Sequence, residues 1–364
     1  MAGRGARRPR RAAGQKRPSR PVLGNDPFER GAAPRAPPPP PPQRATPARL
    51  DQLEARVEEA LSDAEERLER ILSRGGAGRY AAELREALAR LWPTLRERLR
   101  PLASLAGALA SPGPLDPWGM DRRLADRAAP ILDFLYQSWW RVEARGLEAL
   151  PGGPAMLVAN RGGALPWDAL VLRLALQRAG RDLRPLLDDA GLDLPLFGAA
   201  VQRLGAVRAT PEAAGRLLGA GLLVGVFPEG TRGGKKPWSE RYRLQRFGRG
   251  GFAKVALRAG VPIVPCAVVG GEEATPPAAR PGWLGEFLGL PFLAMAPGLP
   301  LGPLGLLPLP SRWAVRCGEP TETRSLGPEK ADDPAAVAAL AEGTRAAVQR
   351  LLDEELAARK SVFL

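Results

Sequence analysis

The sequence predicts an α/β fold, a mixed sheet flanked by helices on both faces. Between residues 155 and 269, short apolar runs rich in β-branched residues alternate with helical patterns. This alternation is typical of α/β domains, in which ligands bind outside the strand ends. With 364 residues and 45% hydrophobic content, the chain has enough apolar material for a large core.

The first part of the chain is a basic, proline-rich tail. Residues 1–49 hold clusters of arginine, the run Pro37–Pro42 and few apolar residues, so we expect disorder with a polyproline-like stretch. The first 50 residues carry ten of the 14 net positive charges. We expect the tail to contact an anionic membrane surface, or else to be solvated. No specific nucleic-acid partner is expected, because the remaining sequence has no basic stripe interleaved with aromatic residues.

Residues 50–112 are predicted to be a helical region ahead of the main domain. Apolar residues recur every three or four positions from 50 to 74, the pattern of an amphipathic helix. A second helical pattern covers 80–98, where Pro93 is expected to kink or interrupt the helix. A Gly-, Pro- and Ser-rich linker follows at 101–117. The helices within 50–98 could pack on the main domain or join two copies of the chain as an oligomer.

The main α/β domain is predicted to span residues 121–325, followed by a C-terminal segment at 326–364 with a helix at 332–359. Helices are expected at 121–139, 167–179, about 194–204, 211–218 and 252–259, and strands at 140–144, 155–159, 183–187, 206–208, 222–227, 262–269 and 313–317. Residues 281–310 interrupt the alternation with Trp, Phe and Leu among many Gly and Pro. This segment is either a buried irregular excursion or a surface that dips into a lipid interface.

The composition excludes several classes of site. The chain has no histidine, which rules out a His-based triad, a His metal site and a His general base. Cys266 and Cys317 are too few for a disulfide framework or a zinc site, so we expect no metal and a reducing compartment. No dinucleotide-binding or Walker motif is present. Neither a secretory signal nor an apolar run of ~20 residues is visible, so the expected location is cytoplasmic, peripheral on the inner face of the membrane.

The clearest candidate site is Phe227–Arg232, FPEGTR, at the end of the strand predicted at 222–227. Pro228 fixes its own φ, and Gly230 lets the backbone approach a ligand. Arg232 offers a planar fork of donors suited to a phosphate group. The alternative interpretation is an ordinary polar turn after a core strand.

Four segments, in this order, resemble the PlsC-like glycerophospholipid acyltransferases, the family that includes the 1-acylglycerol-3-phosphate acyltransferases. Asn160–Asp168 is similar to the family's first block, Leu204–Arg208 to the second and Val261–Pro265 to the fourth, while FPEGTR matches the third residue for residue. The resemblance covers roughly residues 121–323. It implies transfer of a fatty acyl group from acyl-CoA or acyl-ACP to a glycerolipid hydroxyl in phospholipid biosynthesis, with no other cofactor.

The resemblance also assigns roles to residues. Asp168 is the acid that orients the catalytic group, and Arg208 and Arg232 bind the phosphate of the acceptor, which suits their bidentate, charge-assisted hydrogen bonds. Glu229 and Gly230 belong to the acceptor pocket. The predicted catalytic residues are therefore Asp168 and Arg161, and the predicted substrate-binding residues are Asn160, Gly205, Arg208, Phe227, Pro228, Glu229, Gly230, Thr231 and Arg232.

The chain departs from the family at the catalytic residue, because Arg161 stands where the family has histidine. Six residues separate Arg161 from Asp168, where the common pattern has four. Arginine stays protonated at physiological pH and cannot be the general base. Three interpretations remain open: Asp168 is the base and Arg161 stabilises the oxyanion, catalysis is slow and relies on proximity, or the chain is a pseudoenzyme that binds phosphate-bearing lipids. An ion pair with Arg161 is expected to lower the pKa of Asp168, which counts against the first.

Overall fold

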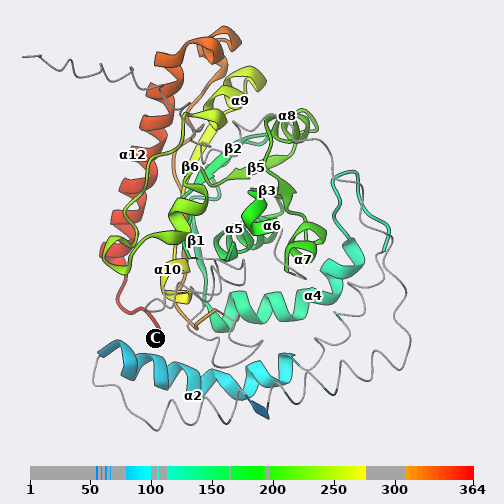
Figure 1. Cartoon of the computed structure of the whole chain (residues 1–364), viewed down its shortest axis with the longest axis vertical. Coiled ribbons are helices and arrows are strands. Elements are labelled where there is room, and N and C mark those ends of the chain that lie inside the picture. Colours follow the sequence, from blue (N-terminus) through cyan, green and yellow to red (C-terminus); the bar gives the residue numbers. More distant parts are fainter. Residues whose placement is uncertain are drawn as a thin grey trace, which may run out of the picture.

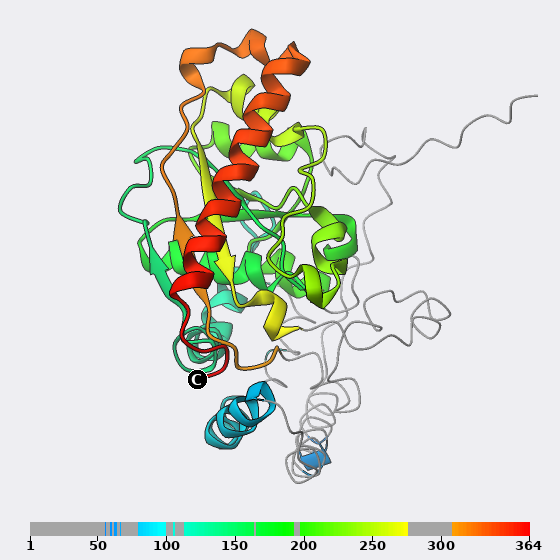
Figure 2. The same cartoon turned by 90° about the vertical axis from the view of Figure 1, so that its left-hand side faces the viewer.

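The computed structural model describes residues 79–99, 113–163, 165–192, 197–275 and 308–364, together with Leu105 and a few isolated positions before residue 79. Within these ranges it shows a mixed sheet with helices on both faces, as predicted (Figure 1, Figure 2). The predicted tail at 1–49, most of the helix predicted at 50–74 and most of the segment 281–310 lie outside the described residues.

The sheet has seven strands among the described residues, in the spatial order β1-β7-β6-β2-β5-β3-β4. They are β1 (Glu143–Arg145), β2 (Met156–Ala159), β3 (Leu183–Leu187), β4 (Val207–Arg208), β5 (Leu223–Val226), β6 (Ile263–Val269) and β7 (Ala314–Cys317). From β6 to β4 all neighbours are parallel, whereas β7 runs antiparallel to β6 and pairs in parallel with β1. The central strands β2, β5 and β6 are buried along their whole length, which explains their continuous apolar runs.

Helices cover each face of the sheet and enclose two apolar cores. One face is covered by α8 (Pro211–Gly219), α9 (Gly251–Ala259) and α12 (Pro334–Ala358). The other face is covered by α4 (Arg122–Phe134), a π-helical turn (Leu135–Trp139) and α5 (Trp167–Arg178). The residues of β2 alternate between the cores, Met156 facing the first and Leu157 the second. No helix in the described part of the chain is long and apolar enough to cross a bilayer.

Capping residues explain where the helices begin. Thr210 caps α8, because its Oγ1 accepts a hydrogen bond from the amide of Ala213 at 3.1 Å. Asp121 caps α4 and Asp333 caps α12 through their carboxylates. A proline occupies the first turn of α8 and of α12, where its missing N–H has no cost.

Three predicted elements differ in the structure. Helix α2 (Arg79–Leu99) is not interrupted at Pro93, because Leu95 and its neighbours pack against the core beside α4 and hold the last turn in place. The strand predicted at 140–144 begins only at Glu143, since the π-helical turn continues the preceding helix and directs two tryptophans into the core. Of the helix predicted at 194–204, the described residues contain α7 (Phe197–Arg203), and a one-turn helix that was not predicted, α6 (Asp189–Leu192), precedes it.

The parallel strands end at one edge of the sheet, where two adjacent connections diverge. The connection from β2 passes through α5 on one face, and that from β5 passes through α9 on the other. Divergence of neighbouring loops opens a crevice of the kind in which α/β proteins bind ligands. The two loops begin at Asn160 and Phe227, so two of the predicted motifs flank this crevice.

Candidate active site

The loop after β2 is tied to the neighbouring strand by Asn160. The side chain of Asn160 is buried, and its Nδ2 donates to the carbonyl oxygen of Val268 at 2.9 Å. Its Oδ1 accepts from the amide of Val268 at 2.8 Å. Both polar groups of this predicted substrate-binding side chain therefore contact β6 and fix the point where the loop leaves the sheet.

Arg161 and Asp168 form a buried ion pair at the start of α5. Arg161 Nη1 donates to Asp168 Oδ1 at 2.6 Å, and the two side chains are only 8% and 1% exposed. The backbone amides of Gly162 and Ala169 donate to Oδ2 and Oδ1 of Asp168, each at 2.9 Å. Both carboxylate oxygens are thus occupied, and Asp168 holds the guanidinium of Arg161 in one position.

The environment raises the pKa of Asp168 overall, although its ion pair with Arg161 lowers this pKa as predicted. Burial disfavours the charged carboxylate and is the largest influence. The charge of Arg161 and the hydrogen bonds from Gly162 and Ala169 lower the pKa and offset only part of the effect of burial. The sequence indicates the pair but not its burial, which decides the direction.

The FPEGTR motif directly follows β5. It packs against the loop between β2 and α5, which is called the Arg161 loop below. Its first four residues are buried, the fifth is half-buried, and a 3₁₀ helix runs from Gly230 to Lys235. Glu229 Oε2 accepts from the backbone amide of Arg161 at 2.9 Å, and its Oε1 accepts from the amide of Gln245 at 2.8 Å. The interpretation of the motif as an ordinary polar surface turn is therefore wrong, since Glu229 anchors the backbone of the neighbouring loop.

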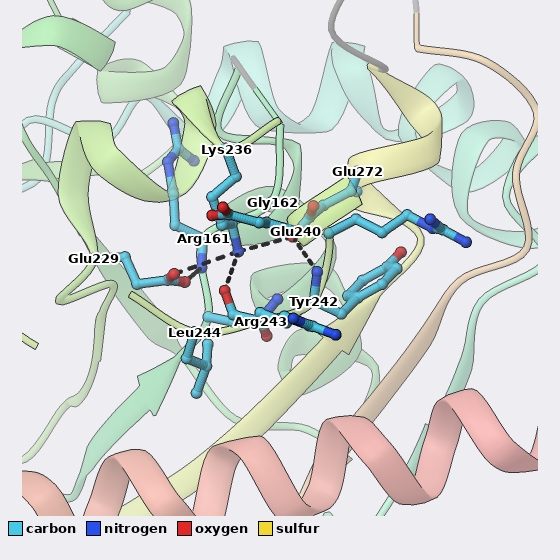
Figure 3. A network of polar contacts seen from close by, with 12 residues as sticks. Arg161, Gly162, Glu229, Lys236, Glu240, Tyr242, Arg243, Leu244 and Glu272 are labelled. Atoms are coloured by element: carbon cyan, nitrogen blue, oxygen red, sulfur yellow. Dashed lines mark hydrogen bonds and ion pairs between the residues drawn. The ribbon is translucent and has the colours of Figure 1, made fainter. Parts of the chain in front are cut away.

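Lys236 joins these two loops to a third. Its Nζ lies 3.3 Å from Glu229 Oε1 and 2.9 Å from Glu272 Oε1, and Figure 3 shows the ammonium group between the two carboxylates. All three side chains are buried. Glu272 lies in α10 (Gly271–Ala274), the short helix after β6. The loops after β2, β5 and β6 therefore meet around one charged cluster, which consists of Glu229, Lys236 and Glu272.

Two carboxylates in the charged cluster share a single ammonium group. Burial raises the pKa of Glu272 to about 7, although Lys236 and a hydrogen bond from the amide of Tyr242 oppose the shift. The neighbouring carboxylates raise the pKa of Lys236, outweighing the effect of its burial. The cluster therefore gains a proton on Glu272 as the pH falls below neutrality.

Lys236, Tyr242 and Glu272 are residues of this region that sequence reasoning missed. The available signal was the acidic pair Glu272–Glu273, which directly follows an apolar strand and so lies at the ligand-binding edge of the sheet. Tyr242 gave no comparable signal. It has a left-handed backbone, with φ of 61°, and its hydroxyl donates to Glu273 and accepts from the amide of Gly270 at 2.7 Å.

A small cleft lies beside Arg161, between the ends of β2, β3 and β5. It is lined by Arg161, Leu186, Leu187, Asp188, Ala209, Val226, Phe227 and Gly230. Its free volume of about 10 Å³ is close to that of one water molecule or hydroxyl group. Three predicted site residues, Arg161, Phe227 and Gly230, therefore meet at a cleft of hydroxyl size.

The other predicted ligands do not line this cleft. Arg208, at the end of β4, is exposed and forms an ion pair with Asp189. Arg232 is exposed on the 3₁₀ helix. Gly205 has φ of 105°, and a Cβ there would lie 2.9 Å from the guanidinium carbon of Arg173, so packing requires glycine at this position.

The cysteines and acidic residues in the described ranges do not form a metal site. No group of three or more Cys, Asp or Glu residues there could hold a metal ion. Cys266 and Cys317 face each other across β6 and β7 as buried free thiols, with their Sγ atoms 3.2 Å apart. Burial raises the pKa of the Cys266 thiol and keeps it protonated at neutral pH.

Comparison with known proteins finds similarity to lipid enzymes. A family model described as Acyltransferase matches residues 141–269. An uncharacterized protein of Mycobacterium leprae is 42% identical over 279 residues, which cover 74% of this chain and 76% of that protein. The mouse DGAT1/2-independent enzyme synthesizing storage lipids is 28% identical over 222 residues, covering 59% of this chain and 61% of that protein. The crystal structure of the 1-acyl-sn-glycerophosphate acyltransferase PlsC from Thermotoga maritima aligns with a TM-score of 0.41 and 19% identity, covering 66% of this chain and 84% of that one.

Proposed function

The chain belongs to the acyltransferase family and is an acyltransferase, and we propose that it transfers a fatty acyl group from acyl-CoA or acyl-ACP to the hydroxyl of a glycerolipid. The observation that carries this proposal is the cleft beside Arg161, where a fixed positive charge borders a space the size of one hydroxyl group. The name of the mouse relative, which refers to storage-lipid synthesis, supports a lipid acceptor. If the acceptor carries a phosphate group, the proposed reaction belongs to phospholipid biosynthesis.

Arg161 supplies electrostatic stabilisation in this reaction. Attack of a hydroxyl on a thioester carbonyl places negative charge on the carbonyl oxygen, and a positioned cation at that point lowers the barrier. The guanidinium is always charged, and its ion pair with Asp168 holds it in place before substrate arrives. The site is shielded from bulk water, which strengthens the interaction.

Asp168 acts in this proposal as the residue that positions Arg161. The raised pKa of Asp168 favours a base, but both of its oxygens already accept hydrogen bonds, and its side chain is 1% exposed. A substrate hydroxyl reaches this carboxylate only after the loop after β2 has come apart. The geometry therefore favours the interpretation in which Arg161 stabilises the oxyanion while the proton goes elsewhere.

The proposed reaction is tested by single-turnover transfer of a radiolabelled acyl group by the purified full-length chain. Acyl-CoA and acyl-ACP serve as donors, and lysophosphatidic acid and diacylglycerol as acceptors. We expect product with the native chain, and a decrease of roughly 10²–10³-fold in rate for Arg161→Met, because one oxyanion donor is lost. No transfer by the native chain with any pair, together with transfer by Arg161→His, would instead identify a lipid-binding pseudoenzyme.

The acceptor class is tested separately at Arg232. This side chain is exposed two residues after Gly230, which lines the cleft, so we propose that it contacts the phosphate of the acceptor. Arg232→Ala should raise KM for lysophosphatidic acid and leave KM for diacylglycerol unchanged. Equal KM values for lysophosphatidic acid in both proteins would exclude this contact.

We also propose that the enzyme contacts an anionic membrane through the basic tail at residues 1–49. Deletion of the tail should abolish cosedimentation with phosphatidylserine vesicles but preserve turnover of detergent-solubilised substrate. Cosedimentation that persists after the deletion would place the membrane contact elsewhere in the chain.

A further inference from the structure

We propose that Asp188 is the general base of the acyl transfer, the group that takes the proton from the acceptor hydroxyl. The inference rests on the proposed function. A chain without histidine that transfers acyl groups to a hydroxyl needs another proton acceptor near Arg161. Carboxylates are the side chains that remain for this task at neutral pH.

Two carboxylates near the Arg161 loop, those of Asp168 and Glu229, are already committed to other contacts, and a third, that of Glu272, pairs with Lys236 and accepts from the amide of Tyr242. Asp168 accepts three hydrogen bonds, one from Arg161 and two from backbone amides. Glu229 accepts from the amides of Arg161 and Gln245 and pairs with Lys236. Both side chains are at most 1% exposed, so neither carboxylate faces a space that a substrate can enter.

Asp188, unlike these carboxylates, lies at the cleft. It follows β3 directly and lines the cleft together with Arg161 and Gly230. Its side chain is half-buried, which allows contact with a substrate. Its Oδ1 accepts from the amide of Gly191 at 3.1 Å, and within the described ranges Oδ2 has no hydrogen-bond partner. The residues that line the cleft thus include one acid and one arginine, the two kinds of residue that the reaction requires.

The chemical step balances with these two groups. The acceptor oxygen donates an electron pair to the thioester carbonyl carbon as its proton passes to the carboxylate of Asp188. The carbonyl π electrons move to oxygen and form an oxyanion stabilised by Arg161. The carbonyl then re-forms, the C–S bond breaks, and the departing sulfur takes the proton from Asp188. The products are the ester and the free thiol of the donor, and Asp188 is a carboxylate again.

Asp188 also has a structural contact, because its Oδ1 caps the one-turn helix α6. The experiment must therefore distinguish helix capping from proton transfer. The variant Asp188→Ser separates the two roles, since a serine oxygen caps a helix as well as a carboxylate does but cannot act as a general base. Asp188→Glu keeps a carboxylate at this position but extends the side chain by one methylene group. Asp133→Asn, which alters an exposed carboxylate paired with Arg178 on the outside of α4 and α5, is the matched control.

The experiment measures single-turnover acyl transfer, KM for acceptor and thermal stability of the native full-length chain and these variants. We expect Asp188→Ser to lower the rate by roughly 10²–10⁴-fold with little change in KM or Tm. We expect partial activity for Asp188→Glu, rescue of Asp188→Ser by added formate, and native activity for Asp133→Asn. Formate supplies a carboxylate but no helix cap, so a structural defect would not be rescued.

The pH profile gives a second measurement. The charged groups facing Asp188 are Arg161 across the cleft and, beside it in the chain, the Asp189–Arg208 ion pair. Asp188→Ser should alter the pH profile of the rate, because it removes the proposed proton acceptor. An active native chain whose rate and profile survive Asp188→Ser, or a variant that loses activity and stability together without rescue, would overturn the inference but leave the proposed function intact. An inactive native chain would overturn both.

Discussion

Replacing Glu229 by glutamine should destabilise the protein strongly, although the change removes only a charge. Glu229 is fully buried and accepts from two backbone amides, those of Arg161 at 2.9 Å and Gln245 at 2.8 Å. A glutamine oxygen can accept from one of these amides, but its NH₂ group then faces the other. One buried N–H is left without an acceptor, which costs about 1–3 kcal/mol.

The substitution also removes one of the two anions beside Lys236. Glu272 remains 2.9 Å from the ammonium group, so the cation keeps one partner. Breaking a buried charged contact of this kind typically costs about 3–5 kcal/mol when no partner is left, and the retained partner reduces that figure. Together the two effects predict a loss of about 3–5 kcal/mol in the free energy of unfolding, which corresponds to a decrease in Tm of roughly 10 °C.

Denaturant unfolding and calorimetry of Glu229→Gln test this reasoning, with Glu240→Gln as the matched control. The side chain of Glu240 is exposed and, in the described part of the chain, accepts a hydrogen bond only from Nε2 of Gln245, so its substitution should change stability by less than about 0.5 kcal/mol. If Glu229→Gln unfolds like the native chain and shows only a raised KM for acceptor, Glu229 is a substrate ligand and not the anchor of the Arg161 loop.

Three further outcomes follow from the same region. The pKa of Glu272 is raised to about 7, so this residue contributes its full stabilisation below about pH 4.5, and the contribution is lost as the pH rises through 7. Between these pH values the free energy of unfolding should therefore fall less for Glu272→Gln than for the native chain. Gly163→Ala should cost more than about 2 kcal/mol in unfolding experiments, since φ is 75° and a Cβ would lie 2.0 Å from Thr275 Oγ1, whereas Gly153→Ala, with open space, should be near neutral. Asn160→Asp, which places a carboxylate oxygen against a carbonyl of β6 in place of a donor, should lower Tm by several degrees, and an unchanged Tm would show that the bridge to β6 is dispensable.

The sheet and its helices could be predicted from the sequence because their signals are local. Continuous apolar runs mark β2, β5 and β6, and each is separated from the next helix by Gly or Pro. The pair Arg161 and Asp168 could also be predicted, since only six residues separate them and a loop after a strand brings them together. The strand at 140–144 was misplaced because a π-helical turn continues the preceding helix as far as Trp139, and no local pattern in the sequence marks such a turn.

The charged cluster and the cleft could not be predicted, because their residues come from separate elements. Lys236 meets Glu272 only after β6 and the segment before it have folded against the loop after β5. The pKa of Asp168 depends on how completely the protein excludes water, which no local pattern encodes. Nothing in the sequence singled out Asp188, and only the cleft distinguishes it from its neighbours.

The way in which the Arg161 loop is anchored has an evolutionary consequence. The anchors are the side chain of Asn160, the backbone amide of Arg161 and the backbone amide of Gly162, bound to β6, Glu229 and Asp168 respectively. None of them uses the side chain at position 161, so these three contacts do not depend on which residue stands there. An exchange between histidine and arginine at this position would therefore leave the three anchors of the loop in place.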